Sequence, residues 1–283
     1  MNRKDKKAIL KSREILQNPY AYDNGLGGYD AYIVNAAQCK KTLMVKKNSE
    51  KYAVWSDGEI KTKAREMLVL LWRQKDKLWK EGAPIDPVDL IDPEKALGLL
   101  GYDVILVDYL GEYYSGSDKF EVAGEIDKKA KKVRICRNLP RQTHMFTMAH
   151  ELGHAILHEG LSLHRDKPVD GFSGIGRNKK EKEADRFAVN FLMPEKLVQE
   201  RFEQAFGTDN FELTDETGFA LQMAGYKDLL DRDVSLRQLA RILAKTGSYA
   251  GNFFNSLASQ FGVSVEAMAI RLEELRLVRD PRK

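Results

Sequence analysis

The stretch "FTMAHELGHAILH", residues 146–158, contains the pattern H-E-x-x-H at His150, Glu151 and His154. On an α-helix, which advances about 100° per residue, residues four apart lie one turn apart on the same face. The two imidazoles therefore point the same way, and Glu151 is displaced to their flank. Zinc hydrolases need two neutral nitrogen ligands and a carboxylate close to the bound water. The stretch predicts such a helix, but H-E-x-x-H also occurs by chance, so the prediction requires a third ligand.

A third histidine does not supply that ligand. The longer metzincin pattern H-E-x-x-H-x-x-G-x-x-H requires a glycine and then a histidine. This chain has Leu157 and Gly160 at those two positions, which excludes the metzincin class. The remaining candidates are carboxylates further along the chain.

The segment "EKEADRFAVNFL", residues 181–192, is typical of a second helix and offers those carboxylates. With Glu181 set at 0°, Asp185 falls at about 40° on the face that also carries small apolar residues, whereas Glu183 falls roughly opposite. We therefore expect Glu181 to be the third ligand and Glu183 to point to water. Asp185 is placed to accept a hydrogen bond from the second nitrogen of a ligand histidine, a contact that fixes the tautomer.

His158 follows His154 by one further turn of the first helix. The sequence leaves two interpretations of it open: a contact beside the metal site, or a packed or half-exposed histidine. His144 and His164 are weaker candidates for the site.

The predicted ligand set implies a mechanism. Two histidines and one glutamate leave an open coordination position for water. A metal at this position lowers the pKa of the water toward about 7 and polarises the scissile carbonyl. Glu151 would accept the water proton and deliver it to the leaving amine. Zinc is the default metal for these ligands, and manganese is the alternative.

The composition places the chain among globular proteins. Hydrophobic residues make up 43% and charged residues 31% of the 283 residues, which is ordinary for a soluble protein. No apolar run approaches the roughly 18 residues of a membrane span, so we expect no membrane partner. The start "MNRKDKKAIL" lacks the apolar core of a signal peptide, and the two cysteines form no C-x-x-C pair. We therefore expect a cytoplasmic protein with reduced thiols.

Charge is distributed unevenly along the chain. Residues 1–82 contain 18 Lys and Arg against 10 Asp and Glu, a net +8, whereas residues 83–283 contain 28 against 32, a net −4. Such an excess is usually a solvated surface, and its alternative is a docking surface for nucleic acid or an acidic partner. A second function class follows from that alternative: a non-enzymatic, metal-stabilised regulator that binds nucleic acid through its N-terminal region. A nucleic acid that activates the enzyme would combine the two.

The remaining pattern predicts an α+β fold. Apolar stretches at residues 102–108, 121–127 and 132–137 predict strands, and the polar turn "KKAK" before the last one indicates a small antiparallel sheet packed against helices. A shorter helix is expected to begin after Asp92, its N-cap. The glycine-rich residues 159–178 predict a loop, which we expect to gate the active-site cleft.

Three regions follow in order along the chain. We expect a basic N-terminal extension at residues 1–60, a metal-binding domain at residues 61–205 and a helical region at residues 206–283. The sheet edge beside the active-site helix is expected to hold an extended peptide as an added strand.

The helical region ends in "SLASQFGVSVEAMAIRLEEL", residues 256–275, which has helix-turn-helix spacing. Its second helix offers Arg271 and Arg276 against three glutamates, a poor surface for phosphates. The sequence therefore favours a packing or substrate-docking role over DNA reading.

Three motifs in this order resemble the ImmA/IrrE family of metallo-endopeptidases: "FTMAHELGHAILH", then "EKEADRFAVNFLMP", then "LASQFGVSVEAMAIRLEELRLV". The resemblance covers roughly residues 61–283 and implies a zincin-like core. It also implies that the ligands are His150, His154 and Glu181 and that the catalytic residue is Glu151. Cytoplasmic members of that family cleave helix-turn-helix repressors and so derepress stress, mobile-element or defence genes, which implies a repressor as substrate here.

Overall fold

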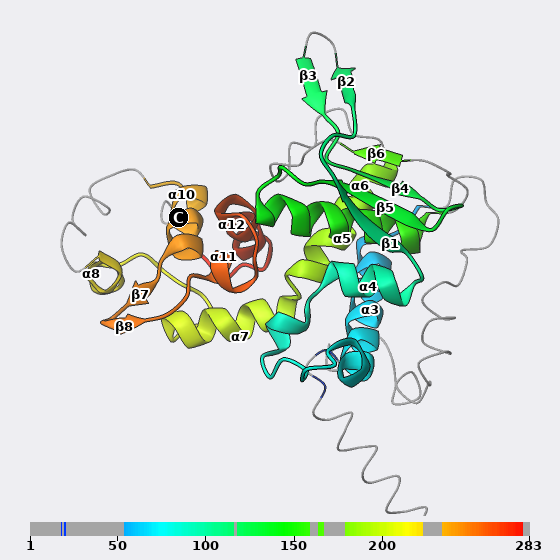
Figure 1. Ribbon diagram of the computed structural model, residues 1–283. Coiled ribbons are helices and arrows are strands. Elements are labelled where there is room, and N and C mark those ends of the chain that lie inside the picture. Colours follow the sequence, from blue (N-terminus) through cyan, green and yellow to red (C-terminus); the bar gives the residue numbers. More distant parts are fainter. Residues whose placement is uncertain are drawn as a thin grey trace, which may run out of the picture.

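The computed structural model describes residues 18, 20, 54–115, 118–158, 164–166, 179–222 and 234–279 (Figure 1). The predicted N-terminal extension falls largely outside these residues, as does most of the predicted gating loop. The roles assigned to both segments stay predictions.

Local sequence signals set the starts of the helices. α3 (Asp57–Leu78) follows Ser56, whose hydroxyl accepts a hydrogen bond from the backbone of Glu59 while the Glu59 carboxylate accepts one from the backbone of Ser56. This capping box satisfies two backbone donors that a helix start leaves open. α4 (Pro93–Leu99) follows Asp92, which is its N-cap as predicted. The other helical elements are η2 (Pro87–Leu90), α5 (Arg141–Leu157), α6 (Lys179–Leu192), α7 (Glu195–Phe206), α8 (Asp215–Gln222), α10 (Leu236–Lys245), α11 (Leu257–Gln260) and α12 (Val265–Glu274).

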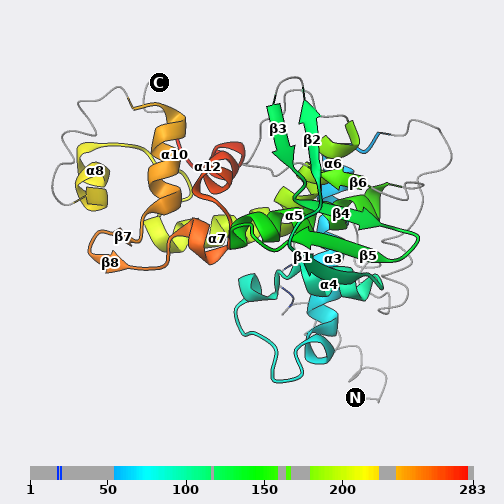
Figure 2. The ribbon, with the colours of Figure 1, turned by 45° about the horizontal axis from the view of Figure 1, so that its top comes forward.

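The α+β class is confirmed, and the three predicted strands are present. They are part of a sheet with the order β1-β5-β4-β6. A separate hairpin, which the sequence did not predict, projects from this sheet (Figure 2). The strands of the sheet are β1 (Asp103–Val107), β4 (Gly124–Asp127), β5 (Lys132–Cys136) and β6 (His164–Asp166), and those of the hairpin are β2 (Glu112–Ser115) and β3 (Asp118–Glu121).

One detail of the predicted sheet is wrong, because the sheet is mixed rather than antiparallel. β4 runs antiparallel to both β5 and β6, but β1 runs parallel to β5, with Val104 opposite Val133. The prediction paired strands that are neighbours in sequence. The chain between β1 and β5 contains the hairpin and β4, and such a long connection lets two strands run in the same direction.

Helices cover one face of the sheet (Figures 1 and 2). α5 contacts β4 and β5, and α6 lies between α5 and α3. Buried α3 residues recur at helical spacing and form the inner part of this layer; they include Ile60, Ala64, Met67, Leu68 and Leu71. α6 thus lies beside α5, and α5 lies next to β4, which positions the candidate site.

The C-terminal region is mainly helical, as predicted, and lies on the side of the molecule away from the sheet (Figure 1). α7 leads from α6 to this region, where α10 packs on α12. Buried apolar residues from α3 through α12 form one continuous cluster. α3 begins at Asp57, ahead of the predicted boundary at residue 61. The division into three regions stays a prediction.

One point of the described N-terminal chain is anchored. The ring of Tyr20 is only 5% exposed and meets Trp72 of α3 edge to face, at 6.3 Å between ring centroids. Its hydroxyl donates to the backbone oxygen of Pro87. Burial and the nearby Asp86 raise the pKa of this tyrosine well above its usual range.

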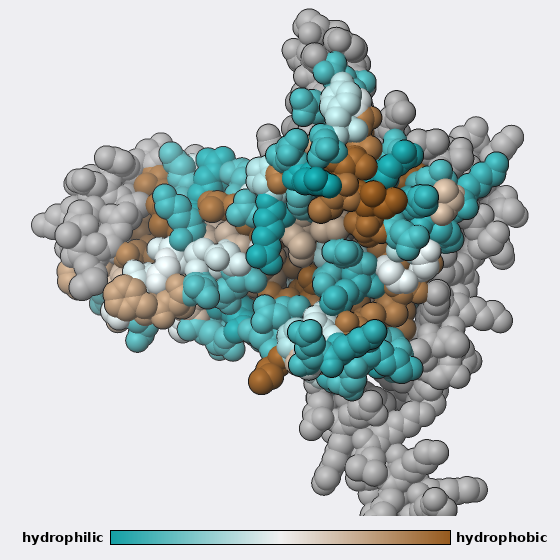
Figure 3. Space-filling view, in the orientation of Figure 1, coloured by the Kyte–Doolittle hydropathy of each residue, from teal (hydrophilic) through white to brown (hydrophobic). Residues whose placement is uncertain are grey.

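The surface is mostly hydrophilic on the face shown in Figure 3, with apolar side chains gathered over the sheet. β1 exposes Ile105 and Leu106 by 37% and 45%. No helix among the described residues combines the length and the apolar character needed to cross a membrane.

Candidate metal centre

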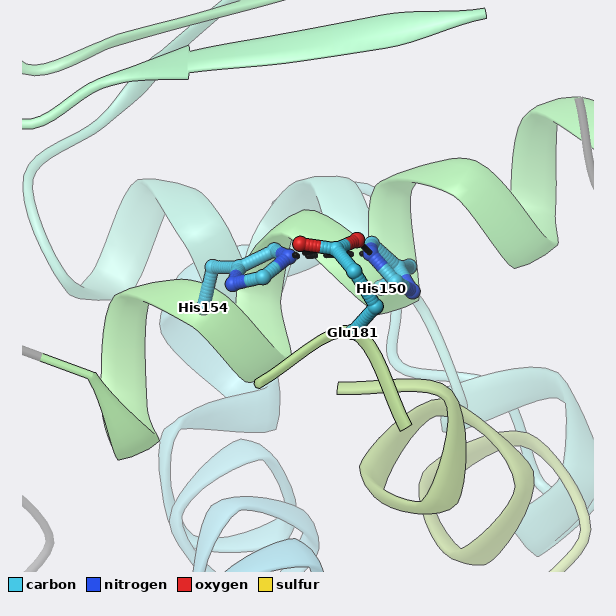
Figure 4. A group of neighbouring side chains, drawn as sticks. All are labelled: His150, His154 and Glu181. Atoms are coloured by element: carbon cyan, nitrogen blue, oxygen red, sulfur yellow. Dashed lines mark hydrogen bonds and ion pairs between the residues drawn. The ribbon is translucent and has the colours of Figure 1, made fainter. Parts of the chain in front are cut away.

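Two neighbouring helices supply the candidate ligands, whose side chains point toward one another (Figure 4). His150 and His154 come from α5, and Glu181 comes from the first turn of α6. The helices approach closely at Gly153, where an added Cβ atom would lie 3.1 Å from the Cα of Ala184. A side chain at position 153 would force α6 outward, so this glycine lets Glu181 reach the histidines.

The three candidate ligand atoms form a small triangle. Nε2 of His150 lies 2.9 Å from Nε2 of His154 and 3.2 Å from Oε2 of Glu181, and Nε2 of His154 lies 3.5 Å from the same oxygen. Ligand atoms at about 2.0–2.1 Å from a tetrahedral metal lie about 3.3 Å from one another. The triangle therefore has the size of one face of a metal coordination tetrahedron.

The tautomer of His150 follows from its other contact. Its Nδ1 lies 2.8 Å from Oδ1 of Asp185. Because an ionised carboxylate only accepts hydrogen bonds, Nδ1 of a neutral His150 carries the hydrogen and Nε2 carries the lone pair.

The tautomer of His154 follows from a longer chain of contacts. Nε2 of His158 lies 2.9 Å from Oε2 of Glu183, so a neutral His158 donates there and accepts at Nδ1. Nδ1 of His154 lies 2.9 Å from that acceptor and therefore donates to it. This leaves the lone pair of His154 on Nε2.

The three candidate ligand atoms consequently fit a divalent metal ion. Two nitrogen lone pairs and a carboxylate oxygen would repel one another at 2.9 to 3.5 Å unless a cation lies between them. The two histidines are almost fully buried, at 1% and 0% exposure. His150, His154 and Glu181 are the residues that would hold the ion.

Glu151 lies on the same helix, between the two histidines in sequence, and is 0% exposed. Its Oε1 approaches Gly124 of β4, where an added Cβ atom would lie 3.1 Å from that oxygen and 2.5 Å from Cγ2 of Thr147. β4 thus passes α5 without a side chain at this point, which leaves room for the carboxylate.

Comparison with known proteins gives a family match over the part of the chain that contains this site. Residues 108–227 match the family Peptidase_M78, described as the IrrE N-terminal-like domain. The predicted family resemblance is confirmed over these residues, which include α5 and α6, and the match supports a peptidase-like role for this part of the chain.

One relative of this chain is a phage protein. The chain is 34% identical over 103 residues to "Uncharacterized immunity region protein 2" of Bacillus phage phi105. The alignment covers 36% of this chain and 62% of the relative, so the chain spans less than two thirds of that protein's length.

The prediction that Glu183 points to water is wrong. This residue is only 7% exposed, and its Oε1 accepts a hydrogen bond of 3.0 Å from the backbone nitrogen of Trp55. The prediction treated α6 as an isolated cylinder with one buried face. α6 instead lies between α3 and α5, so the side opposite Glu181 is also covered by protein.

His158 is packed in the interior, and its Nδ1 also lies 2.9 Å from Nδ1 of the candidate ligand His154, so it combines features of both interpretations. A signal in the sequence was available: His150, His154 and His158 repeat every four residues, and Glu181, Glu183 and Asp185 alternate on the next helix. His144 is not part of the group, since its Nε2 contacts the backbone oxygen of Cys136 at 2.7 Å.

Proposed function

We propose that this protein is a cytoplasmic, zinc-dependent endopeptidase that performs limited proteolysis of a partner helix-turn-helix transcriptional repressor. The observation that carries the proposal is the convergence of two histidine nitrogens of α5 with an oxygen of Glu181 from α6. α5 also carries the fully buried Glu151. The family match over residues 108–227 supports the peptidase class.

Each site residue has a distinct task in this proposal. His150, His154 and Glu181 hold the zinc ion, and Asp185 orients His150 through its Nδ1 hydrogen. When bound, the ion supplies Lewis-acid polarisation of the scissile carbonyl and activation of a water molecule. Glu151, which is buried on the same helix as the two histidines, accepts the water proton and passes it to the leaving amine.

The relative encoded in a phage immunity region supports a repressor as the substrate class. Cleavage of the repressor would derepress stress, mobile-element or defence genes. The C-terminal region, whose charged residues pair mostly with one another, suits packing or substrate docking better than binding to DNA phosphates.

The strand order specifies which sheet edge could bind an extended peptide, as the sequence predicted. β4 approaches Glu151 at Gly124, but its two sides are paired with β5 and β6, so it is not an edge. Among the described strands, β6 is the outer one on this side. We propose that an extended peptide pairs with β6.

The proposal is tested by a cleavage assay with the metal-loaded protein and the helix-turn-helix repressor encoded beside it, with and without single-stranded DNA. The Glu151→Gln variant retains the shape of the side chain but cannot take a proton, and we expect cleavage to fall at least about 100-fold while metal binding is retained. Glu200→Gln, on the exposed side of α7, is the matched control and should cleave like the wild type.

Two results would contradict the proposal. One is wild-type cleavage by the Glu151→Gln variant. The other is intact repressor after incubation with metal-loaded wild-type protein under both DNA conditions, which would favour the non-enzymatic regulator. A dependence of cleavage on DNA would assign the basic N-terminal residues an activating role.

A further inference from the structure

The two candidate ligand histidines are supported in different ways. Asp185 contacts His150 directly, whereas His154 reaches its carboxylate, Glu183, through a second imidazole, that of His158. Both carboxylates and the ligand Glu181 come from the first two turns of α6. One short helical segment therefore supplies a ligand and the supports of the other two.

The contacts beyond His154 run in one direction. Three donors point in order toward the Glu183 carboxylate: Nδ1 of His154 donates to His158, Nε2 of His158 donates to Oε2 of Glu183, and the backbone of Trp55 donates to Oε1 of Glu183. A carboxylate that accepts from an imidazole raises the basicity of that imidazole and fixes its ring. Here the effect passes through His158 to the nitrogen of His154 that faces the metal position.

Trp55 connects this chain of contacts to the segment that precedes α3. Besides its backbone contact with Glu183, its indole Nε1 donates to the backbone oxygen of Leu157 at 2.8 Å. That oxygen belongs to the last residue of α5, next to His158. Lys128 holds the same helix end, because its amine donates to the backbone oxygens of His154 and His158.

A purely structural role does not account for Glu183. Burying a carboxylate costs several kcal/mol unless partners satisfy it, and an apolar residue fills the same space at lower cost. Its neighbours on α6 include Ala184, Phe187 and Ala188, all 0% exposed, so apolar residues are common in this layer. Each oxygen of the Glu183 carboxylate instead accepts a hydrogen bond, one from the His158 imidazole and one from the backbone N–H of Trp55.

We infer that Glu183 and His158 are positioning residues for the ligand His154, and that Trp55 fixes Glu183, so that metal affinity depends on the docking of the segment that precedes α3. This inference rests on the proposed metal site. It adds a route by which the N-terminal part of the chain acts on the metal centre without contacting it.

The test measures zinc affinity of the full-length protein by competition with a chromogenic chelator. Glu183→Gln keeps the shape of the side chain but places an amide N–H against one of two donors, and we expect the affinity to fall about 10- to 100-fold. His158→Phe should give a loss of the same size. The double variant should be no weaker than the weaker single variant, because both act on the same ligand.

A second pair of substitutions provides the contrast. Asp185→Asn weakens the support of His150 instead, so its loss should multiply with that of Glu183→Gln in the double variant. The cobalt-loaded protein adds a geometric readout, since Glu183→Gln should shift the visible absorption band of the bound ion. The metal-free Glu183→Gln protein should still unfold cooperatively at a thermal midpoint above the assay temperature, so that the affinity is measured on folded protein.

Trp55→Phe keeps an aromatic ring but removes the indole donor to Leu157, and we expect a smaller loss of affinity, about fivefold. Trp79→Phe, at the other end of α3, is the matched control and should leave the affinity unchanged.

The outcomes separate this inference from the proposed function. Wild-type zinc affinity in Glu183→Gln, or a lowered metal-free midpoint with unchanged affinity, would overturn the positioning role and leave the peptidase proposal intact. Multiplying losses for Glu183→Gln and His158→Phe would also overturn it. Absence of zinc binding by the wild type would instead reject the proposed metal site.

Discussion

The α5–α6 pair and the α10–α12 pair both bring ionisable side chains of two packed helices together, with opposite results. At α10–α12, each carboxylate meets a guanidinium: Glu266 contacts Arg237 at 2.8 Å and Arg241 at 2.5 Å, and Glu273 also contacts Arg237. At α5–α6, imidazole nitrogens and carboxylate oxygens converge instead. In the first group the opposite charges are paired, whereas in the second, among the described residues, three acceptor atoms surround one point without a positive charge between them.

Burial separates the two groups further. The side chains of the α10–α12 group are 19% to 48% exposed, and those of His150 and His154 are at most 1% exposed. Hydrogen bonding to Arg241 lowers the pKa of Glu266, which is the effect of a satisfied ion pair. Convergence of ionisable groups therefore marks a candidate site only where the groups are buried and are all acceptors.

Removal of a ligand should give the largest effect. Glu181→Ala deletes one of the three candidate metal ligands, and we expect zinc affinity to fall at least about 100-fold, measured by chelator competition. Addition of a chelator should lower the thermal midpoint of the wild type and leave that of Glu181→Ala nearly unchanged. The chelator acts by removing bound metal, and this variant should have little to lose. Glu200→Ala on α7 is the control, and an equal loss of affinity in it would refute the assignment.

Arg271 is the one buried cation of the described helix α12, and its substitution tests what a buried cation contributes to stability. It is 3% exposed, and its guanidinium donates to the backbone oxygen of Met193 and to Asn190, each at 3.1 Å. Desolvation lowers its pKa. Arg271→Met leaves these acceptors unsatisfied and should lower the free energy of unfolding by about 2–4 kcal/mol, measured by urea denaturation.

Arg241 on α10 provides the exposed counterpart of Arg271. Arg241→Met should leave the urea midpoint close to that of the wild type, because exposed ion pairs contribute little. Equal destabilisation by the two substitutions would show that burial is not what distinguishes these arginines.

Substitution of Gly124 tests whether Glu151 needs the space that β4 leaves beside it. In Gly124→Ala, the new methyl group would meet Cγ2 of Thr147 at 2.5 Å and Oε1 of Glu151 at 3.1 Å. We expect a loss of about 1–3 kcal/mol in unfolding free energy, together with slower cleavage. Gly98→Ala in α4 is matched to it, since nothing lies within 4 Å of the added atom, and it should be neutral or slightly stabilising. Normal cleavage by Gly124→Ala would contradict the packing of Glu151 against β4.

The smallest effect should come from pH acting on Glu266. Its folded pKa is lowered, so its contribution to stability is complete above the ordinary glutamate pKa and is lost as pH falls through the lowered folded value. Glu266→Gln should therefore lower the thermal midpoint slightly at pH 7, by at most about 2 °C, and by less as the pH falls below the ordinary glutamate pKa. A difference between the two proteins that grows on acidification would have the wrong sign.

Some features of the fold were predictable because they depend on neighbours in sequence. The N-cap at Asp92 and the strands at residues 102–108, 121–127 and 132–137 follow from local propensity and turn signals. The convergence of His150, His154 and Glu181 was predictable as well. Helical periodicity aligns the two histidines. The need of a metal for a third ligand then favours a carboxylate, and helix periodicity identifies it as Glu181.

The sequence by itself thus determined which residue types share a helix face, and with them the chemistry of the candidate site. Tertiary structure decided the parallel pairing of β1 with β5 and the burial of Glu183 against Trp55 and His158. These features depend on how separate elements pack. Helix periodicity gives the angles between residues around a helix, but the elements that cover each side are set by contacts between distant parts of the chain.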